Sequence, residues 1–387
     1  MKKRVLSVLL VAVMVVGLLT SCGTSEKTPV DAGTTAMDGK TGSQGITSGM
    51  EAVDGLEANA PEAPTTTGAD VKIGFVSTGV LGDKALTDTT WAGLNKLKDD
   101  YPDVEIKIYE SPNGTTDWEP NIIAASEWAD LVIVNASSCG EILLSVAERF
   151  PDVYYVANEF PVEDNPQFAS DVYTCNEVSF LLGCLAGLFT QNTDIPGINE
   201  EHVVGYISGM EAPTTLDYFT GFEAGAKFTC PDVTVLQSWT GSYTDPLLAK
   251  EMTKGMISQG ADCILGCISS AVVGVFEACD EADIYSFGLD TNKDADYEGT
   301  IITSGLKCGD VTSYKFGKEF IEGTWKPGFI LMDCASGALD ITDMATIKEY
   351  LQMDVIDDYY NQVIGIRDDL RAGEIEVPYI PAARGEE

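Results

Sequence analysis

Histidine is almost absent from this sequence, which holds one histidine in 387 residues. A single imidazole can serve only one role, so most histidine-dependent catalysis and nearly all histidine-ligated metal sites are excluded. Basic residues are also scarce, with 23 Lys and Arg against 61 Asp and Glu and a net charge of −38. A field of this sign repels phosphate backbones and anionic lipid headgroups, so we expect no nucleic-acid partner.

Sequence motifs for catalysis and metal binding are missing as well. There is no Gly-x-Ser-x-Gly elbow and no paired-carboxylate motif, and the one histidine, His202, is expected at the start of a strand without a chemical role. Residues 290–301 place oxygen side chains at four positions of a calcium loop but lack its central glycine and closing glutamate. We predict no catalytic residue, no metal site and no cofactor.

The N-terminal segment has the pattern of a signal peptide. Three basic residues precede an apolar run over residues 5–19, which ends in Leu-Thr-Ser-Cys at positions 19–22. This run is shorter than the ~20 residues of a membrane-spanning helix. Because its ending resembles the bacterial lipobox, we predict a signal peptide over residues 1–21 and fatty acyl chains, such as palmitate, on Cys22. The mature protein is then expected on the cell membrane, lipid-anchored and facing the extracytoplasmic side.

Residues 22–70 are rich in Gly, Thr, Ser, Ala and Glu and show no apolar periodicity, which predicts a disordered tether. Nine cysteines remain besides Cys22, and their odd number argues against a fully paired disulfide framework. The one short spacing, Cys263 to Cys267, differs from the two-residue gap of zinc knuckles. We interpret these nine cysteines mostly as small buried hydrophobic residues.

Short apolar runs alternate with helical patterns twice, over residues 71–157 and again over residues 202–304. This order predicts an α/β fold with two doubly wound parallel-sheet lobes. We assign residues 71–190 and 310–326 to lobe one, and residues 200–306 and 328–387 to lobe two. The chain would then cross between the lobes near Asn192, Gly309 and Pro327. Ligands of such sheets bind at the carboxyl ends of the strands, here in a cleft between the lobes.

The loops that follow the predicted strands contain small residues, amides, carboxylates and aromatic rings. They are residues 77–83, 135–138, 158–159, 208–218, 240–245, 268–270, 290–294 and 305–307. Carboxylates accept hydrogen bonds from hydroxyl groups, and aromatic faces pack against a flat ring. The loops therefore favour a polar ligand that carries a ring.

An ordered set of short motifs resembles the basic membrane protein, or purine-nucleoside receptor, family of ABC-transporter solute-binding lipoproteins. The matching segments are 73–76 (IGFV), 82–84 (GDK), 91–94 (WAGL), 205–210 (GYISGM), 222–225 (FEAG), 239–246 (WTGSYTDP), 259–262 (QGAD), 288–290 (GLD), 303–307 (TSGLK) and 373–378 (GEIEVP). The resemblance covers residues 71–378. It implies a type I periplasmic-binding fold, a nucleoside ligand, with a purine nucleoside favoured, held between the two lobes, and delivery of that ligand to ABC permease subunits.

The resemblance also implies a set of ligand-binding residues. In that family the base lies between aromatic rings, and an Asp and a Lys hold the ribose. By motif, Asp290 becomes the acceptor for ribose hydroxyls, Lys307 a donor, Asp83 a polar contact from the first loop and Tyr243 the stacking ring. The other members of the predicted set are Leu86, Asn135, Ser137, Asn158, Tyr218 and Ser269.

This chain departs from the family pattern at three of these positions. Leu86 stands where the family has an aromatic ring, Asn158 aligns with an Asp that reads the base, and Ser269 replaces a Gly. Asp83 also has a structural alternative, because it could cap the helix that begins near Leu86. The alternative function is a surface lipoprotein that senses or binds another small polar ligand, such as a sugar or a riboflavin-like molecule. A nucleoside-processing enzyme is the least favoured reading. We expect a monomer.

Overall fold

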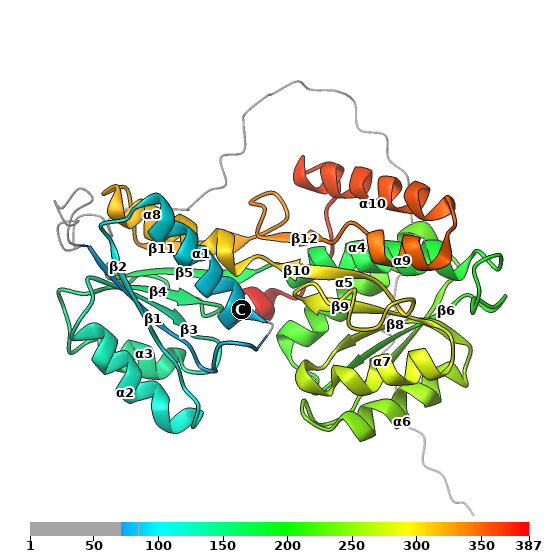
Figure 1. Cartoon of the computed structure of the whole chain (residues 1–387), viewed down its shortest axis with the longest axis horizontal. Helices are drawn as coiled ribbons and strands as arrows, with labels where there is room; N and C mark the ends of the chain where they lie inside the picture. The colour runs from blue at the N-terminus through cyan, green and yellow to red at the C-terminus, as the bar shows by residue number, and fades with distance from the viewer. Residues whose placement is uncertain (1–70, 84, 387) are drawn as a thin grey trace, which may run out of the picture. The chain divides into compact units, whose positions relative to one another are not determined.

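The computed structural model describes residues 71–83 and 85–386, which belong to one compact unit. The predicted signal peptide, the lipid-attachment site at Cys22 and the predicted tether lie outside these residues. The described chain forms two six-stranded sheets with helices on both faces of each (Figure 1). Within residues 71–83 and 85–386, no helix has the length and apolar composition needed to cross a membrane.

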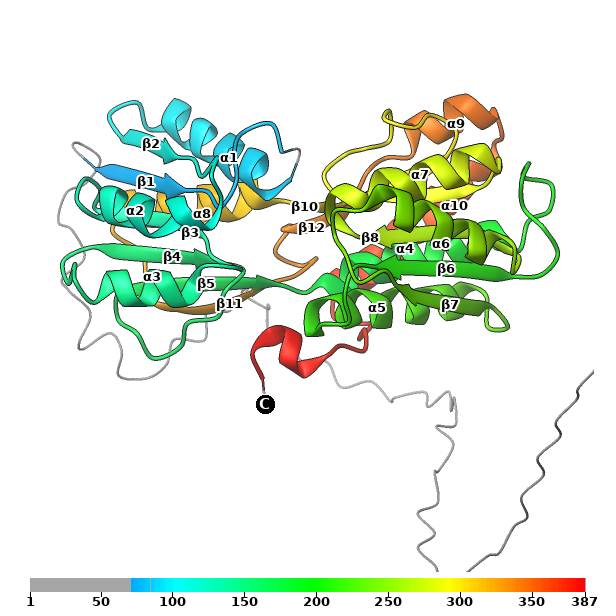
Figure 2. The ribbon, with the colours of Figure 1, turned by 90° about the horizontal axis from the view of Figure 1, so that it is seen from below.

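The first sheet is entirely parallel, in the order β11-β5-β4-β3-β1-β2. Its strands are β1 (Lys72–Val76), β2 (Glu105–Tyr109), β3 (Leu131–Asn135), β4 (Tyr154–Asn158), β5 (Phe168–Tyr173) and β11 (Gly328–Met332). The central strands β3 and β4 are buried along their whole length, as their continuous apolar sequences require. Alternate residues of these strands belong to the two apolar clusters on opposite faces of the sheet. Helices cover both faces (Figure 2). These helices are α1 (Leu86–Asp100) and α8 (Gly309–Ile321) on one face, and α2 (Thr115–Ser126) and α3 (Gly140–Ala147) on the other.

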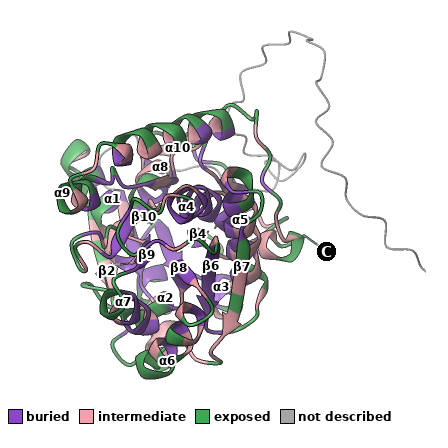
Figure 3. Ribbon diagram, turned by 90° about the vertical axis from the view of Figure 1, so that its right-hand side faces the viewer, coloured by how far each residue is buried: buried purple, intermediate pink, exposed green. Residues whose placement is uncertain are grey.

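The second sheet has the order β12-β10-β9-β8-β6-β7, and only β12 runs antiparallel to its neighbour. Its strands are β6 (Val203–Ser208), β7 (Thr234–Trp239), β8 (Ala261–Cys267), β9 (Tyr285–Asp290), β10 (Ile301–Lys307) and β12 (Leu339–Ile341). One face packs on α6 (Pro246–Ile257) and α7 (Val272–Glu281). The other face packs on α4 (Cys175–Thr190), α5 (Pro213–Thr229), α9 (Ala345–Leu351) and α10 (Val355–Arg371). Figure 3 shows the buried strands at the centre and the exposed outer surfaces of α6, α7 and α10.

Two doubly wound sheets confirm the predicted fold class, but the predicted division of the chain between the lobes is wrong in two places. The sequence predicts helix α4 in lobe one, but it packs closely against α5 of lobe two. A Cβ atom added to Gly183 of α4 would lie 2.2 Å from the carbonyl oxygen of Phe222. Residues 328–387 were assigned to lobe two, yet β11 pairs with β5 in the sheet of lobe one.

The crossings between the lobes follow from these contacts. The chain leaves lobe one at Thr174, returns at Cys308 and crosses again within residues 333–338. The return at Cys308 lies beside the predicted position Gly309, whereas the chain does not cross near Asn192 or Pro327. Helix α4 is buried along almost its entire length. A helix that is apolar on all sides carries no periodicity to indicate which sheet it covers.

All nine cysteines of the described chain are free thiols. Seven are buried, and Cys267 and Cys308 are partly buried. The interpretation of these residues as small core side chains is confirmed. No disulfide therefore stabilises the part of the chain that the structure describes.

Candidate ligand-binding site

A cavity of about 720 Å³ lies at the carboxyl ends of β8, β9 and β10. Its volume falls within the range of small-molecule sites in proteins. It is lined by Asp83, Ala85, Tyr218, Tyr243, Gly266, Cys267, Ile268, Ser269, Ser270, Val272, Val273, Phe276, Leu289, Asp290, Lys293, Asp296, Tyr297 and Lys307. Six residues of the predicted ligand set lie in this wall, namely Asp83, Tyr218, Tyr243, Ser269, Asp290 and Lys307.

A second cavity of about 350 Å³ shares Lys307 with the first. It includes Ser137, another predicted residue, together with Glu159, Tyr173 and Cys175. The C-terminal segment forms part of its wall through Ala382, Ala383 and Gly385. Lys307 therefore contributes to the walls of both cavities.

The Lys307 side chain stands between two carboxylates and two aromatic rings. Its Nζ lies 2.5 Å from Glu159 Oε1 and 3.8 Å from Asp290 Oδ1. The same atom lies 5.5 Å from the ring centre of Tyr173 and 6.0 Å from that of Tyr218. Burial acts to lower the pKa of Lys307, but the charges of Glu159 and its other acidic neighbours outweigh burial and raise the pKa well above its usual value. The ammonium group thus stays charged and can donate to a ligand.

Asp290 is the last residue of β9 and has a left-handed backbone, with φ of 70°. This conformation turns the chain at the end of the strand, and Asp adopts it more readily than most residues. Its side chain is 38% exposed and lines the larger cavity. The distance of 3.8 Å to Lys307 is longer than a hydrogen bond, so the carboxylate can still accept from ligand hydroxyls.

Tyr243 owes its position to a glycine at the end of β6. A Cβ atom added to Gly209 would lie 2.5 Å from the Tyr243 ring. The ring can therefore lie against the Gly209 backbone while it lines the cavity. A larger residue at position 209 would push the ring away. This arrangement suits a face on which a flat ligand ring can stack.

Asp83 serves the fold as well as the cavity. Its carboxylate accepts hydrogen bonds from the backbone N–H groups of Ala85 at 2.9 Å, Thr87 at 3.2 Å and Asp88 at 3.3 Å. Ala85 immediately precedes α1, and Thr87 and Asp88 belong to its first turn, where backbone N–H groups have no partner within the helix. The cap suggested for Asp83 by the sequence is thus present, and Asp83 also lines the cavity.

Three residues of the predicted set, Leu86, Asn135 and Asn158, line neither cavity. Leu86 packs against the start of α8, where a Cβ atom on Gly309 would lie 2.9 Å from Leu86 Cδ1. Asn135 and Asn158 are buried register partners on β3 and β4, and Asn158 Nδ2 donates to Asn135 Oδ1 at 3.3 Å. These two amides lie at the carboxyl edge of the first sheet, where both are buried.

Two acidic residues near Lys307, Glu159 and Asp171, are absent from the predicted ligand set. Glu159 belongs to a loop that the sequence analysis singled out, but nothing in the sequence pairs it with Lys307. Asp171 of β5 is fully buried, its Oδ1 accepts from the Glu159 backbone N–H at 3.3 Å, and burial raises its pKa to about 8. The sequence signal for Asp171 is an acidic residue within the otherwise largely apolar strand β5, because acidic side chains are seldom fully buried unless they are paired.

Two buried oxygens at this edge lack a hydrogen-bond partner within the described chain, Asn158 Oδ1 and Asp171 Oδ2. Asn158 and Asp171 are register partners on β4 and β5. Unsatisfied buried polar atoms are rare and often mark a functional site. Their position favours a polar ligand or ordered water near the lobe junction.

Comparisons with known proteins agree with this arrangement. A family model described as "ABC transporter substrate-binding protein PnrA-like" matches residues 70–380. An uncharacterized lipoprotein of Pyrococcus horikoshii is 24% identical over 300 residues, which are 74% of this chain and 72% of the relative. Basic membrane protein D of Borreliella burgdorferi is 23% identical over 312 residues, 79% of this chain and 87% of the relative. A solute-binding protein of an ABC transporter system from Aeropyrum pernix has the same fold, with a TM-score of 0.64, 23% identity, and coverage of 80% of this chain and 94% of that protein.

Proposed function

Because this chain belongs to the PnrA-like family of ABC-transporter substrate-binding proteins, we propose that its ligand is a nucleoside, with a purine base preferred. The ligand would occupy the cavity of about 720 Å³ and be delivered to the permease subunits of the transporter. The protein is a binding protein and not an enzyme.

The observation that carries this proposal is the juxtaposition of Asp290 and Lys307. They end the adjacent strands β9 and β10, with 3.8 Å between Asp290 Oδ1 and Lys307 Nζ. A carboxylate has two acceptor oxygens and can receive both adjacent hydroxyls of a ribose, while an ammonium group donates to the ring or hydroxyl oxygens. A free base offers no such hydroxyl pair.

The remaining wall suits the base. Tyr243 presents its ring, and Ile268, Val272, Phe276 and Leu289 supply apolar surface. Leu86 is not aromatic and lies outside this wall, so position 86 supplies no second ring to stack on the base. One aromatic pair is worth ~0.5 to 1.5 kcal/mol beyond area burial, so this difference weakens binding by at most about tenfold.

The two lobes share the ligand in this proposal. The cavity includes Asp83 and Ala85 from lobe one, and the Lys307–Glu159 ion pair joins the lobes beside it. Ligand binding would favour closure of the lobes through these contacts. Solution scattering with and without ligand measures closure, and an unchanged radius of gyration at saturation would count against it.

The experiment that tests the ligand is calorimetry against purine and pyrimidine nucleosides, their free bases, riboflavin and simple sugars. We expect nucleosides to bind more tightly than the corresponding free bases, because only nucleosides offer hydroxyls to Asp290. Tight binding of a sugar or of riboflavin without nucleoside binding would instead support the alternative ligand class.

We also propose that the mature protein is anchored to the membrane through Cys22, as the lipobox-like ending at residues 19–22 suggests. Relatives that carry the names lipoprotein and basic membrane protein support this location. Mass spectrometry of the N-terminal peptide tests it. A chain that begins at Cys22 with fatty acyl chains is expected, and an uncut signal peptide or an unmodified N-terminus would contradict it.

A further inference from the structure

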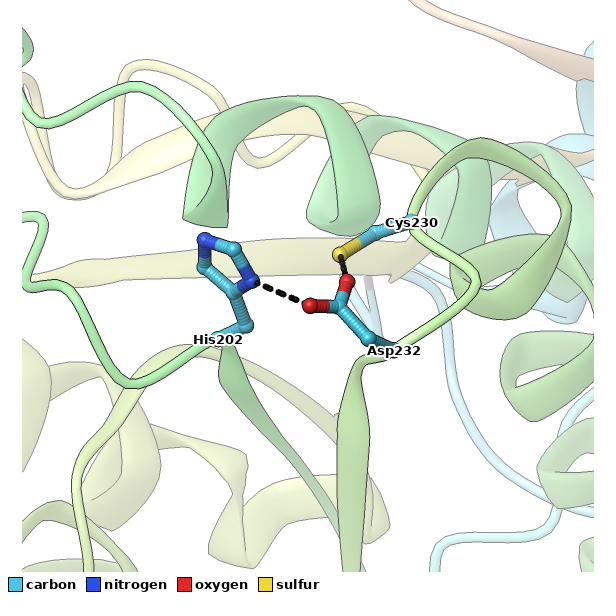
Figure 4. Close-up of side chains that lie close together, drawn as sticks. All are labelled: His202, Cys230 and Asp232. Carbon is cyan, nitrogen blue, oxygen red and sulfur yellow. Dashed lines mark hydrogen bonds and ion pairs between the residues drawn. The ribbon is translucent and has the colours of Figure 1, made fainter.

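The only histidine of the chain lies beside a cysteine and an aspartate, at the start of β6 and in the turn between α5 and β7. Figure 4 shows the side chains of His202, Cys230 and Asp232 pointing toward one another. His202 Nδ1 lies 3.2 Å from Asp232 Oδ2, and Cys230 Sγ lies 3.3 Å from Asp232 Oδ1. One nitrogen, one sulfur and one oxygen atom of the three residues all lie within 4.8 Å of one another.

Backbone hydrogen bonds hold His202 and Cys230 in place. The Val233 N–H donates to the Cys230 carbonyl at 3.1 Å in the turn that contains Asp232. Strands β6 and β7 are parallel neighbours, and the Thr234 N–H donates to the His202 carbonyl at 2.9 Å. Cys230 ends α5, where its N–H donates to the Ala226 carbonyl at 2.8 Å. The side chains therefore come together because the strand pairing and the helix end place them there, independently of their own contacts.

We propose that this cluster is a Zn²⁺ site. Imidazole nitrogen, thiolate sulfur and carboxylate oxygen are the three ligand types that zinc prefers. Zinc–ligand distances of about 2.0 to 2.3 Å place neighbouring ligand atoms of a tetrahedral site roughly 3.3 to 3.7 Å apart. The separations of 3.2 and 3.3 Å involve the two different oxygens of Asp232. With one ligand atom from each residue, the three atoms lie within 4.8 Å of one another, so side-chain rotations would bring them to this spacing.

The chemistry of binding is defined by these three groups. The Cys230 thiol loses its proton to the buffer, and the thiolate, the neutral imidazole and the carboxylate each give one electron pair to the ion. Three protein ligands leave the fourth position to water. Hard cations such as Mg²⁺ and Ca²⁺ prefer oxygen ligands alone and do not match this donor set. The net charge of −38 also raises the concentration of cations near the surface.

This assignment revises two expectations from the sequence, that His202 has no chemical role and that the chain holds no metal site. Those expectations rested on the scarcity of histidine and on cysteine spacing along the chain. The ligands here come from two segments 28 residues apart, His202 and Cys230, which only strand pairing brings together.

The position of the cluster defines the effect of the metal. It lies at the amino ends of β6 and β7, whereas the ligand cavity lies at the carboxyl ends of the strands. Because β7 is the edge strand of its sheet, the ion would join this edge to β6 and stabilise the folded protein. Zinc should therefore raise the melting temperature without competing for the ligand cavity.

The test is Zn²⁺ titration of the mature full-length chain by calorimetry, with Co²⁺ as a spectroscopic probe. We expect one ion per chain, a raised melting temperature and a thiolate-to-cobalt charge-transfer band. His202→Gln and Cys230→Ser should each weaken Zn²⁺ binding at least tenfold and abolish that band. Cys308→Ser removes a partly buried thiol beyond the carboxyl end of β10, away from the cluster, and should change neither the Zn²⁺ affinity nor the band.

Loss of the band in Cys230→Ser and His202→Gln, with its retention in Cys308→Ser, supports a built site. Equal Zn²⁺ affinity in the wild type and the His202→Gln variant, or a Co²⁺ complex without a charge-transfer band, would overturn it, since the ion would then sit on surface carboxylates. Because the His202 side chain is partly exposed, we expect the His202→Gln variant to fold. It therefore still tests the site if Cys230→Ser does not fold.

Discussion

Replacing Asp290 by Asn tests the proposed ligand site most directly. The substitution keeps the shape of the side chain but removes its charge and one acceptor oxygen. Asn also tolerates the φ of 70° at this position, whereas Ala would add a backbone cost of roughly 1 to 2 kcal/mol unrelated to the ligand. A hydrogen bond to a charged group is worth about 1.5 to 3 kcal/mol, so we expect nucleoside affinity to fall about 10- to 150-fold.

The assay is calorimetric titration of wild type and variant with a purine nucleoside and with its free base. The free base lacks the ribose, so its affinity should change little. Asp296→Asn is the matched control, because Asp296 lines the same cavity but is exposed. Loss of an exposed charge is worth at most about 1 kcal/mol, or fivefold in affinity. Unchanged nucleoside affinity in Asp290→Asn, with the melting temperature preserved, would refute the assignment of this carboxylate to the ligand.

Two further substitutions test the surroundings of the site. Gly209→Ala should displace the Tyr243 ring and weaken nucleoside binding roughly tenfold, whereas Gly255→Ala, whose Cβ would meet no atom within 4 Å, should leave calorimetric affinity unchanged. Asp171 has its pKa raised by burial to about 8, so its protonated form stabilises the fold at low pH and this stability is lost as pH rises toward 8. Urea unfolding at pH 5 and pH 8 should show that Asp171→Asn removes part of this decline, by a few kcal/mol at most. Asp262→Asn should alter the slope of stability with pH only below about pH 6, because burial raises the pKa of Asp262 to about 6. Identical pH profiles for wild type and Asp171→Asn would show that Asp171 titrates as an ordinary surface acid.

Much of the fold could be predicted because its signals are local. Strands such as β3 and β4 are continuous apolar runs, and α1 carries its buried residues at helical spacing. Asp290 and Lys307 could be placed for the same reason, since each ends a strand and carboxyl ends of parallel strands meet at one edge.

Other features depend on contacts between segments distant in the sequence. Helix α4 is apolar on every side, so its periodicity could not assign it to lobe two. The partner of β11 was equally undetermined, because a strand's own residues do not specify which sheet edge it joins.

By itself, the sequence determined the alternation of strands and helices, the acidic charge and the order of the loops that line the cavity. Hydrophobic periodicity and charge are properties of each segment alone. Only the tertiary structure decided that Glu159 pairs with Lys307, that Gly209 makes room for the Tyr243 ring, and that His202 meets Cys230. The two residues of each pair come from different segments. They come into contact only after both sheets have formed and the chain has crossed between the lobes.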